Sequence, residues 1–492
     1  MANSYENFIA GKWSPPKSDK RFERENPATG ETIGSFPDSG PDDVADAVAA
    51  AAEAYPRWRA TPAPRRAEIL FRAAETMLAR KEELSRDVTI EMGKVLKEAR
   101  GDVQEAIDMT YFVAGEGRRM FGQVVPSELP DKFAMAVRQP HGIIAAITPW
   151  NFPAAIPCWK LMPALIAGNT AVFKPSPYSP LSAFNLVRIL EESGLPPGVV
   201  NLVFGEDEAG AALVRDPRVT MVSFTGSLEV GREIASYCGA AGKRVHLEMG
   251  GKNAIIVLDD ADIDLAIEGA VWSAFGTSGQ RCTAASRMIV HNGVLDGFTR
   301  KLVSRAGSLR LGDGLDEATE VGPVVNRPQL EKIQGYMEIG RKEGAEVAVG
   351  GARASGDGLD RGYFFQPTVF TDVRPGMRIA QEEIFGPVTD VIPVSDLDEA
   401  VAVNNDVPYG LVASIYTRDV SVAFKAMEQI TTGIVYINAG TIGAEVQLPF
   451  GGTRGTGNGH REAGTAALDS YSEWKTVYID YSGRLQKAQI DR

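Results

Sequence analysis

The amino-acid sequence predicts an α/β protein built around two doubly wound parallel sheets. Short β-branched, apolar runs alternate with helix-length segments from residue 143 onward, which is typical of a parallel sheet covered on both faces by helices. The alternation restarts after Gly250-Gly251, so we expect a boundary between two α/β domains there. The length of 492 residues agrees with this prediction, because it allows about three domains at roughly 150 residues each.

The N-terminal part of the chain predicts short strands and turns followed by helices. Residues 1–40 are rich in Gly, Pro and charged residues and predict irregular strands. Asp42-Asp43 follows a proline and favours the start of a helix, because acidic residues stabilise the first turn. Apolar residues recur at helical spacing within 64–84, and the segment 102–121 also predicts a helix.

The two alternating regions place most strands between helices. In the first region the expected strands are 143–148, 170–174, 199–204, 220–224 and 244–248. The expected helices of that region are 156–167, 181–193, 207–215 and 227–239. The second region continues with strands at 254–258 and 286–291 and helices at 262–274 and 294–308.

Two more strands are predicted outside these regions, at 133–138 and 474–481. They are either edge strands of the core or a β arm that adds to the sheet edge of a neighbouring subunit. Both interpretations place these strands at the edge of a sheet, so the strand pattern alone does not decide between them.

The composition is that of a globular protein that does not bind nucleic acid. Lys and Arg number 51 against 64 Asp and Glu, so the net charge of −13 repels phosphate backbones. The three cysteines are too few and too scattered for a disulfide framework or a metal site, which predicts a reducing compartment. The N-terminus has no signal-peptide pattern, and the apolar stretches 143–149 and 161–173 are too short to span a bilayer. We therefore expect a cytoplasmic protein without a membrane partner.

Cys282 is the candidate nucleophile. It follows a loop with two glycines, which let a backbone approach a ligand closely, and it adjoins Arg281. A thiol needs positive potential or a nearby base to ionise at neutral pH, and Arg281 offers the former. The alternative is a small buried hydrophobic residue, and that interpretation suits Cys158 and Cys238.

Two further candidates follow predicted strands, where open parallel sheets gather functional groups. Glu248 ends the strand 244–248, and partial burial would raise its pKa toward the range of a general base. Asn151 lies in a loop with a proline on each side, and its side-chain N–H can stabilise an oxyanion. The structural alternatives are a solvated carboxylate at Glu248 and an asparagine that caps the following helix.

Three segments suit a nucleotide. Lys174, followed by Pro175-Ser176, ends a strand and can reach ribose hydroxyls or phosphate, although a solvated lysine is the alternative. Thr225-Gly226-Ser227 leads into a helix, with Gly231 one turn later, and the free N–H groups of such a helix start bind phosphate. The segment 381–387 offers a carboxylate for ribose hydroxyls and an aromatic ring for packing.

Taken together, the order and spacing of these motifs are similar to those of NAD(P)-dependent aldehyde dehydrogenases. The matching motifs are the asparagine loop, Lys-Pro-Ser, Phe-Thr-Gly-Ser, Glu-x-Gly-Gly-Lys, Gly-Gln-x-Cys, Glu-Glu-Ile-Phe-Gly-Pro and a late Pro-Phe-Gly-Gly. The resemblance extends over residues 5–482. Within the superfamily the chain resembles the semialdehyde-oxidising branches.

The resemblance implies a reaction and the residues that catalyse it. Cys282 would form a thiohemiacetal and then a thioester with the aldehyde, and Glu248 would be the general base for hydrolysis. Asn151 and the backbone N–H of Cys282 would form the oxyanion hole. The product would be a carboxylic acid, NAD or NADP would be the cofactor, and no metal would be needed.

The resemblance also implies a cofactor site. The residues expected to bind the cofactor are Trp150, Lys174, Ser176, Gly226, Ser227, Gly231, Glu383 and Phe385. In many NAD-preferring relatives a glutamate three residues after the lysine binds the ribose hydroxyls, and Pro177 stands at that position here. Because no carboxylate at position 177 repels a 2′-phosphate, we expect the protein to use both NAD and NADP.

The resemblance divides the chain into three parts. A Rossmann-like cofactor domain would take 1–120 and 141–249, and a catalytic domain would take 250–450. A small β oligomerisation arm would take 121–140 and 465–492. The family assembles as homodimers or homotetramers through such arms, which favours the arm interpretation of the two strands at the rim.

The substrate is expected to be an aldehyde with a distal carboxylate. In the semialdehyde-oxidising branches, a Gly-Ala backbone pair and a basic residue before the cysteine hold that carboxylate, and Gly443-Ala444 and Arg281 fit the pattern. Aminoadipate, glutamate or 2-oxoglutarate semialdehyde would suit such a site. The alternatives are a broad-specificity aliphatic or aromatic aldehyde dehydrogenase, a coenzyme A-acylating semialdehyde dehydrogenase and a non-catalytic relative. Glu248 argues against the acylating enzyme, and the intact catalytic residues argue against the non-catalytic relative.

Overall fold

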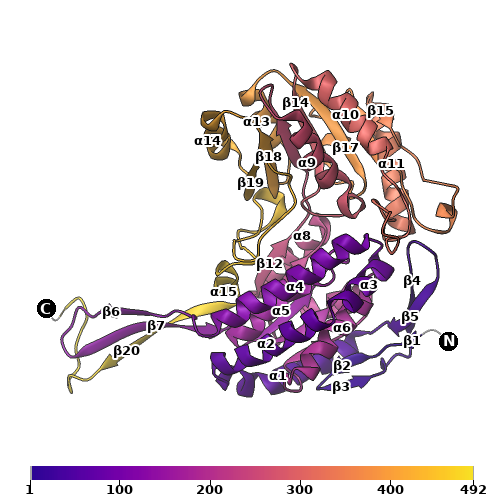
Figure 1. Cartoon of the computed structure of the whole chain (residues 1–492). Coiled ribbons are helices and arrows are strands. Elements are labelled where there is room, and N and C mark those ends of the chain that lie inside the picture. The colour runs from indigo at the N-terminus through magenta and orange to yellow at the C-terminus, as the bar shows by residue number, and fades with distance from the viewer. Residues whose placement is uncertain (1–2, 491–492) are drawn as a thin grey trace.

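In residues 3–490, which this computed structural model describes, the strands form two seven-stranded sheets and two three-stranded sheets (Figure 1). One large sheet lies in the lower half of the molecule in Figure 1 and the other in the upper half. A narrow three-stranded sheet projects from the lower half. The α/β fold class predicted from the sequence is therefore confirmed.

The first large sheet has the strand order β12-β11-β8-β9-β10-β2-β3, in which β12 through β10 run parallel. Its strands are β2 (Asn7–Ile9), β3 (Lys12–Ser14), β8 (Ile143–Ile147), β9 (Thr170–Lys174), β10 (Val200–Leu202), β11 (Val219–Thr225) and β12 (Arg244–Glu248). Each parallel strand predicted from the sequence is present. Because β8 lies between β9 and β11, the winding reverses beside it, and sheets of this kind bind ligands beyond the carboxyl ends of their strands at that point.

Helices cover both faces of this sheet, because successive side chains of a strand point to opposite faces. Ile143 and Ala145 of β8 pack toward one set of helices, and Ile144 and Ala146 pack toward the other. The first set is α1 (Pro41–Ala60), α7 (Asp207–Arg215) and α8 (Leu228–Ala241). The second set is α2 (Ala63–Ala79), α3 (Lys81–Met92), α4 (Leu96–Glu116), α5 (Ala155–Ala167) and α6 (Pro180–Glu192).

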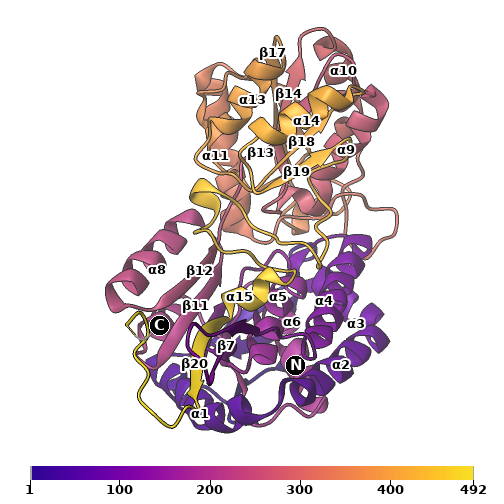
Figure 2. The ribbon, with the colours of Figure 1, turned by 90° about the vertical axis from the view of Figure 1, so that its left-hand side faces the viewer.

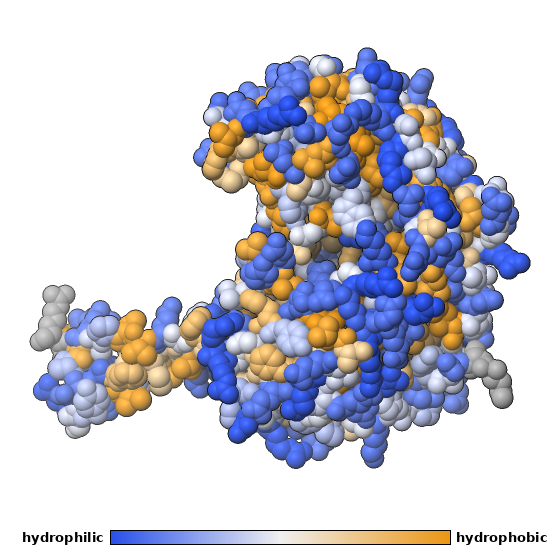
Figure 3. Space-filling view, in the orientation of Figure 1, coloured by the Kyte–Doolittle hydropathy of each residue, from blue (hydrophilic) through white to orange (hydrophobic). Residues whose placement is uncertain are grey.

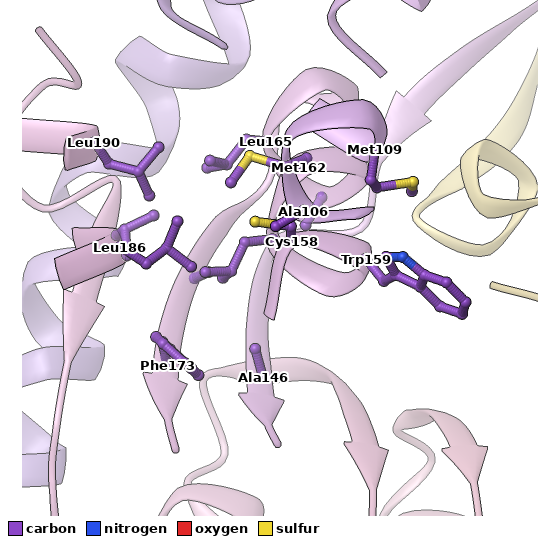
Figure 4. Close-up of a cluster of buried hydrophobic side chains, with 14 of the residues drawn as sticks. Ala106, Met109, Ala146, Cys158, Trp159, Met162, Leu165, Phe173, Leu186 and Leu190 are labelled. Atoms are coloured by element: carbon purple, nitrogen blue, oxygen red, sulfur yellow. The ribbon is translucent and has the colours of Figure 1, made fainter. Parts of the chain in front are cut away.

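Helix α5 forms the centre of the second set. Figure 4 shows Cys158, Met162 and Leu165 of α5 among apolar side chains of the neighbouring helices and strands. Cys158 is a free, buried thiol in this cluster, as expected for a small hydrophobic residue. Trp159 points away from these side chains in Figure 4 and contributes instead to the wall of a cavity that Cys282 also lines.

The helices before β8 differ from the sequence prediction at their ends. The periodic segment 64–84 is divided between α2 and α3, because the backbone leaves helical geometry at Arg80 (φ −104°, ψ 14°). Gly93 in the left-handed region ends α3, and α4 then begins at Leu96, earlier than the predicted start at 102. The earlier start matters because it places Glu98 on α4, beside the nucleophile loop.

The second large sheet has the strand order β15-β16-β17-β14-β13-β18-β19. Its strands are β13 (Asn253–Val257), β14 (Ala285–His291), β15 (Glu346–Val349), β16 (Thr368–Thr371), β17 (Val388–Val394), β18 (Val412–Tyr416) and β19 (Ile434–Ile437). On one face lie α9 (Ile263–Phe275) and α10 (Leu295–Gly307). On the other lie α11 (Arg327–Glu343), α12 (Arg378–Gln381), α13 (Leu397–Asn405) and α14 (Val420–Gln429). The chain crosses from the first sheet to the second between β12 and β13, through Gly250-Gly251.

The projecting sheet consists of β6 (Gln123–Pro126), β7 (Lys132–Pro140) and β20 (Ser472–Asp480). Strands β7 and β20 pair antiparallel over their whole lengths, from Lys132 opposite Asp480 to Pro140 opposite Ser472. The two rim strands predicted from the sequence thus pair with each other in a sheet of their own, and they are not edge strands of a core sheet. Figure 2 shows this sheet from the end, below α15 (Ala466–Ser470).

The remaining short elements lie at the N-terminus and in loops. Strands β1 (Asn3–Ser4), β4 (Arg21–Glu25) and β5 (Thr32–Pro37) form the other three-stranded sheet. Single 3₁₀ turns are η1 (Gly276–Gly279), η2 (Leu359–Arg361) and η3 (Arg454–Thr456). Among residues 3–490, no helix combines the length and apolar character that crossing a membrane requires.

Candidate active site

A cavity of about 320 Å³ lies where α4, α5 and the ends of both large sheets meet. Five of the residues that the sequence singled out line it together: Cys282, Glu248, Arg281, Gly443 and Ala444. Its apolar wall comes from the side chains of Phe152, Ile156, Trp159, Trp272, Leu411 and Phe450. The cavity therefore combines a thiol, a carboxylate and a guanidinium with an apolar channel, as a small organic substrate requires.

The loop that carries Cys282 is held in an unusual backbone conformation. Thr277 and Ser278 have φ values of 54° and 55°, in the left-handed region that residues other than glycine rarely adopt. The backbone N–H of Thr277 donates to both carboxylate oxygens of Glu98, at 2.9 Å each, and Ser278 Oγ donates to Gly322 O at 2.7 Å. These long-range contacts keep the loop in a conformation that it would not adopt alone.

The Cys282 thiol is protonated at neutral pH in this environment. Burial raises its pKa to about 12, and the nearby carboxylates of Glu383, Glu248 and Glu105 act in the same direction. Arg281 does not supply the positive potential expected from the sequence. Its guanidinium lies 3.4 Å from the Glu98 carboxylate and its Nε donates to Thr277 Oγ1 at 2.8 Å. A base would have to remove this proton before the thiol could act as a nucleophile.

Glu248 lies at the end of β12 and is only 6% exposed. Its Oε2 has no hydrogen-bond partner in the part of the chain that the structure describes. Burial raises its pKa well above the usual range, the neighbouring Glu462 raises it further, and Lys160, which forms an ion pair with Glu462, opposes both effects. A buried carboxylate with a raised pKa and an unpaired oxygen in the cavity has the properties of a general base.

Asn151 lies beside the nucleophile loop and is 3% exposed. Its Nδ2 donates to the backbone oxygen of Gln280 at 3.0 Å, two residues before Cys282. An amide nitrogen carries two N–H groups, so one remains for an oxyanion. Asn151 does not cap helix α5, which has no side-chain cap hydrogen bond.

The residues proposed to bind the adenosine part of a cofactor follow β9 and β11, outside the cavity. Lys174 ends β9, is 6% exposed and has no hydrogen bond or ion pair with any residue in the range 3–490. Ser176 Oγ accepts a hydrogen bond from the N–H of Tyr178 at 3.2 Å. Ser227 is the N-cap of α8, and its side chain accepts from the N–H of Val230 at 3.3 Å.

Two glycines allow a close approach near the start of α8. A Cβ at Gly226 would lie 2.4 Å from the Phe224 ring, and a Cβ at Gly231 would lie 2.4 Å from Met249 Sδ. Gly231 therefore brings α8 against the end of β12. The start of α8 itself offers N–H groups and a positive dipole end next to β11, an arrangement that fits a phosphate.

The residues proposed for the nicotinamide end meet between the two sheets. The rings of Trp150 and Phe385 contact edge to face, with centroids 5.4 Å apart. Glu383 Oε1 accepts a hydrogen bond from the N–H of Gly251 at 2.9 Å, next to the crossing between the sheets. Burial raises the pKa of Glu383. The half-buried Glu383 carboxylate, the Trp150–Phe385 ring pair and the buried Lys174 fit the ribose and ring groups of a dinucleotide.

Sequence reasoning missed residues that reach the site across long sequence separations. Asn253 donates through Nδ2 to the backbone oxygens of Cys282 at 2.7 Å and of Ala284 at 2.9 Å, and so fixes the nucleophile loop. Glu98 and Glu105 enter the cavity from α4. Glu98 and Glu105 lack a local motif, whereas Asn253 belongs to the Glu-x-Gly-Gly-Lys-Asn segment and could have been noticed there.

Comparisons with known proteins show the family to which the chain belongs. The model of the aldehyde dehydrogenase family matches residues 13–477. An alpha-ketoglutaric semialdehyde dehydrogenase of Bacillus subtilis is 41% identical over 97% of this chain and 98% of its own length. An alpha-ketoglutarate semialdehyde dehydrogenase of Haloferax volcanii is 43% identical over 98% of this chain and 100% of its own length.

Among solved structures, betaine aldehyde dehydrogenase of Staphylococcus aureus in complex with NAD+ is 34% identical with a TM-score of 0.96. The match covers 98% of this chain and 96% of that one. The two proteins therefore share the whole fold and not only the sequence motifs. The chain therefore belongs to the aldehyde dehydrogenase family and is an enzyme that oxidises an aldehyde to a carboxylic acid with NAD or NADP.

Proposed function

We propose that this enzyme oxidises an aldehyde that carries a distal carboxylate, through a thioester on Cys282. The observation that carries the proposal is that one cavity holds Cys282, Glu248, Arg281 and the Gly443-Ala444 backbone. The two semialdehyde dehydrogenases named above support it, since a 2-oxoglutarate semialdehyde carries a carboxylate at the end opposite the aldehyde.

The first step joins the substrate to the protein. Glu248 takes the thiol proton and releases it to solvent, and Cys282 Sγ then bonds to the aldehyde carbon and forms a thiohemiacetal. The oxygen becomes an alkoxide that accepts hydrogen bonds from Asn151 Nδ2 and the Cys282 backbone N–H. When NAD or NADP is bound, its nicotinamide ring accepts the hydride that leaves this carbon, so that a thioester remains on Cys282.

The second step frees the product. Water is a poor nucleophile at neutral pH, so Glu248 takes a proton from the water that attacks the thioester carbon. The carbon–sulfur bond breaks, the carboxylic acid leaves and Cys282 regains its proton. The unpaired Oε2 of Glu248 is the oxygen available for this transfer.

The cofactor would lie along the carboxyl ends of the first sheet. Lys174 and Ser176 would hold the adenosine ribose, and Gly226, Ser227 and Gly231 at the start of α8 would serve the pyrophosphate. Glu383, Phe385 and Trp150 would hold and orient the nicotinamide riboside.

Acidic side chains outnumber basic ones around the cavity, but those on α4 are paired or largely neutral, which leaves room for an anionic substrate beside Arg281. Two of its three acidic side chains on α4 are paired: Glu98 with Arg281 at 3.4 Å and Asp102 with Lys94 at 3.0 Å. Glu105 forms no ion pair within the described chain, but burial raises its pKa to about 8, so it is largely neutral at pH 7. Arg281, which lies over the Phe152 and Trp272 rings, lines the same cavity as the thiol and would be the cation that meets the substrate carboxylate.

We also propose the domain division and the assembly that the sequence suggested. Residues 1–120 and 141–249 form the cofactor domain, 250–450 the catalytic domain, and 121–140 with 465–492 the arm. The arm adds to the exposed edge strand β19 of a second copy, which gives a homodimer or homotetramer. The three free cysteines support a reducing, cytoplasmic location.

A substrate panel tests this proposal. We expect kcat/KM to be highest for the semialdehydes of 2-oxoglutarate, glutarate and aminoadipate. Their values should exceed those for hexanal, benzaldehyde and the cationic betaine aldehyde by at least about tenfold, which corresponds to the free energy of one ionic contact with the substrate carboxylate. Arg281→Gln should lower kcat/KM for the semialdehydes at least about tenfold more than for hexanal, which serves as the internal control.

Two results would contradict the proposal. One is that neutral or cationic aldehydes are oxidised more efficiently than every semialdehyde in the panel. The other is that coenzyme A is required and an acyl-coenzyme A is the product, because an acylating enzyme does not use a base at Glu248.

A further inference from the structure

We propose that the carboxylates of Asp38, Glu206 and Asp207 recognise the 2′ position of the adenosine ribose and make NAD the preferred cofactor over NADP. This inference rests on the cofactor site of the proposed function and specifies its selectivity. It concerns three residues that the sequence motifs do not include.

The topology brings these residues to the adenosine end of the site. In doubly wound sheets that bind dinucleotides, the strand next to the first one, on the side away from the reversal in strand order, ends near the 2′ group of the adenosine ribose. That strand is β9, which ends at Lys174, and its neighbour β10 leads directly to α7, which begins at Asp207. The first turn of α7 therefore stands beside the end of β9.

Lys174 packs against α7 and has no partner of its own. A Cβ at Gly210 of α7 would lie 4.0 Å from Lys174 Cε, so the lysine stem runs along that turn. Lys174 as a residue is 6% exposed, and its ammonium forms no hydrogen bond or ion pair between residues 3 and 490. A buried, unpaired cation at the end of β9 indicates a ligand with oxygen acceptors.

The three carboxylates act on that ammonium. Burial lowers the pKa of Lys174 to about 8, and Asp207, Glu206 and Asp38 oppose the change, in that order. The backbone N–H of Glu206 donates to Asp38 Oδ1 at 3.3 Å, which ties the segment after β5 to the start of α7. No side chain among the described residues forms an ion pair with any of the three.

The resulting charge favours a hydroxyl over a phosphate. Ribose hydroxyls donate hydrogen bonds to carboxylates, whereas a 2′-phosphate carries close to two negative charges and is repelled by them. The positive end of the α7 dipole does not compensate, because Asp207 and Glu208 already occupy its first turn. The missing carboxylate at Pro177, from which both cofactors were expected, is thus replaced by others that lie more than 25 residues away in sequence.

Nucleotide binding to the whole apo-enzyme tests the inference without catalysis. The probes are 5′-ADP and 2′,5′-ADP, measured by calorimetry at low ionic strength, since salt screens exposed charges. We expect the wild type to bind 5′-ADP at least about fivefold more tightly, and Asp207→Asn to reduce this ratio at least about threefold. Glu208→Gln, at a neighbouring acid that is not among the groups acting on Lys174, is the matched control and should change the ratio less than Asp207→Asn does.

Steady-state kinetics gives the second readout. The wild type should show a kcat/KM for NAD at least about tenfold above that for NADP. Asp207→Asn combined with Glu206→Gln should raise the NADP value, because the repulsion of the 2′-phosphate is removed, and should lower the NAD value, because the ribose hydroxyls lose charged acceptors. An equal or higher kcat/KM for NADP in the wild type, or an equal response to Glu208→Gln, would overturn the inference alone. Failure to oxidise aldehydes with either cofactor would instead contradict the proposed function.

Discussion

At the scale of single residues, the site places Cys282, the proposed nucleophile, among carboxylates. Glu383, Glu248 and Glu105 all disfavour the thiolate of Cys282, and Arg281 is engaged by Glu98. The resting thiol is therefore neutral, and its reactivity depends on a base and on oxyanion stabilisation. Attack on an aldehyde must produce an alkoxide, so the donors around Cys282 contribute most at that step.

Asn151→Ala tests the oxyanion role. The variant loses one of two aimed donors, and we expect the single-turnover rate of NADH formation to fall by about 10²–10³. Aldehyde oxidation is followed in a stopped-flow instrument, and titration of Cys282 with a maleimide checks that the nucleophile loop stays accessible. A loss of less than about threefold would show that the side chain is only a structural support for Gln280.

Glu105 predicts a pH effect on substrate binding. Burial raises its pKa from 4.5 to about 8, so the group is neutral below that pH and negative above it. The KM for an anionic semialdehyde should therefore rise as the pH increases from 7 to 9, whereas the KM for hexanal should stay flat.

Glu105→Gln removes the titrating group and should abolish that rise. With hexanal, which carries no charge, the KM of the wild type should not rise over the same pH range. A variant that keeps the full pH dependence of the semialdehyde KM would assign the effect to another group.

At the scale of elements, the turn between β12 and β13 joins the two halves of the site. A Cβ at Gly250 would lie 2.2 Å from the Glu383 carboxylate, and one at Gly251 would lie 2.6 Å from the Cys282 backbone oxygen. The two glycines are therefore needed for close packing of three functional segments. The Glu-x-Gly-Gly motif is a packing requirement as well as a sequence signature.

Gly251→Ala should displace the nucleophile loop, because its Cβ would meet backbone at 2.6 Å and the Asn253 side chain at 2.8 Å. We expect kcat to fall at least about tenfold, as misplacement of a reacting atom by a fraction of an ångström does. Gly239→Ala in α8 is the control, since a Cβ there meets no atom within 4 Å. Unchanged kcat in Gly251→Ala, with normal melting temperature, would contradict this role for the turn.

The sequence predicted elements better than it predicted contacts between them. The ends of β9 and β12 coincide with their prediction, because apolar β-branched runs there are bounded by Gly, Pro and charged residues. The break at Arg80 carries no Gly or Pro and was missed. The contact between Glu98 and Thr277 spans 179 residues, and no local pattern can reveal it. For the same reason the ion pair between Arg281 and Glu98 could not be predicted from the sequence.

At the scale of the whole molecule, the arm and the second sheet carry complementary exposed features. Figure 3 shows apolar side chains along the projecting arm, where Trp474 and Tyr478 are 46% and 64% exposed. Strand β19 is the edge strand of the second sheet, so its outer edge has no partner strand among residues 3–490. Val420, Phe424 and Met427 of α14 are exposed apolar residues, and Figure 1 shows α14 and β19 on the same side of the upper half of the molecule. Exposed apolar surface of this kind often marks a protein–protein interface, and we propose that here it contacts another copy of the chain.

The double variant Trp474→Glu with Tyr478→Glu should weaken assembly. We expect the wild type to sediment as a dimer or tetramer of the 52.9 kDa chain and the variant to shift to the monomer at micromolar concentration. Leu78→Glu, at an exposed apolar position on α2, is the control and should not change the mass. A wild-type enzyme that is monomeric at that concentration would contradict the arm assignment.

The most direct test of the mechanism is to trap the acyl group on the protein. Glu248→Gln is mixed rapidly with a semialdehyde and NAD, quenched with acid and analysed by peptide mass spectrometry. The account predicts a burst of about one NADH per active site, slow turnover afterwards and an acyl group on Cys282, because hydrolysis lacks its base. Cys282→Ser should give no burst. Steady turnover of Glu248→Gln at the wild-type rate, or a burst without an acyl group on Cys282, would contradict the account.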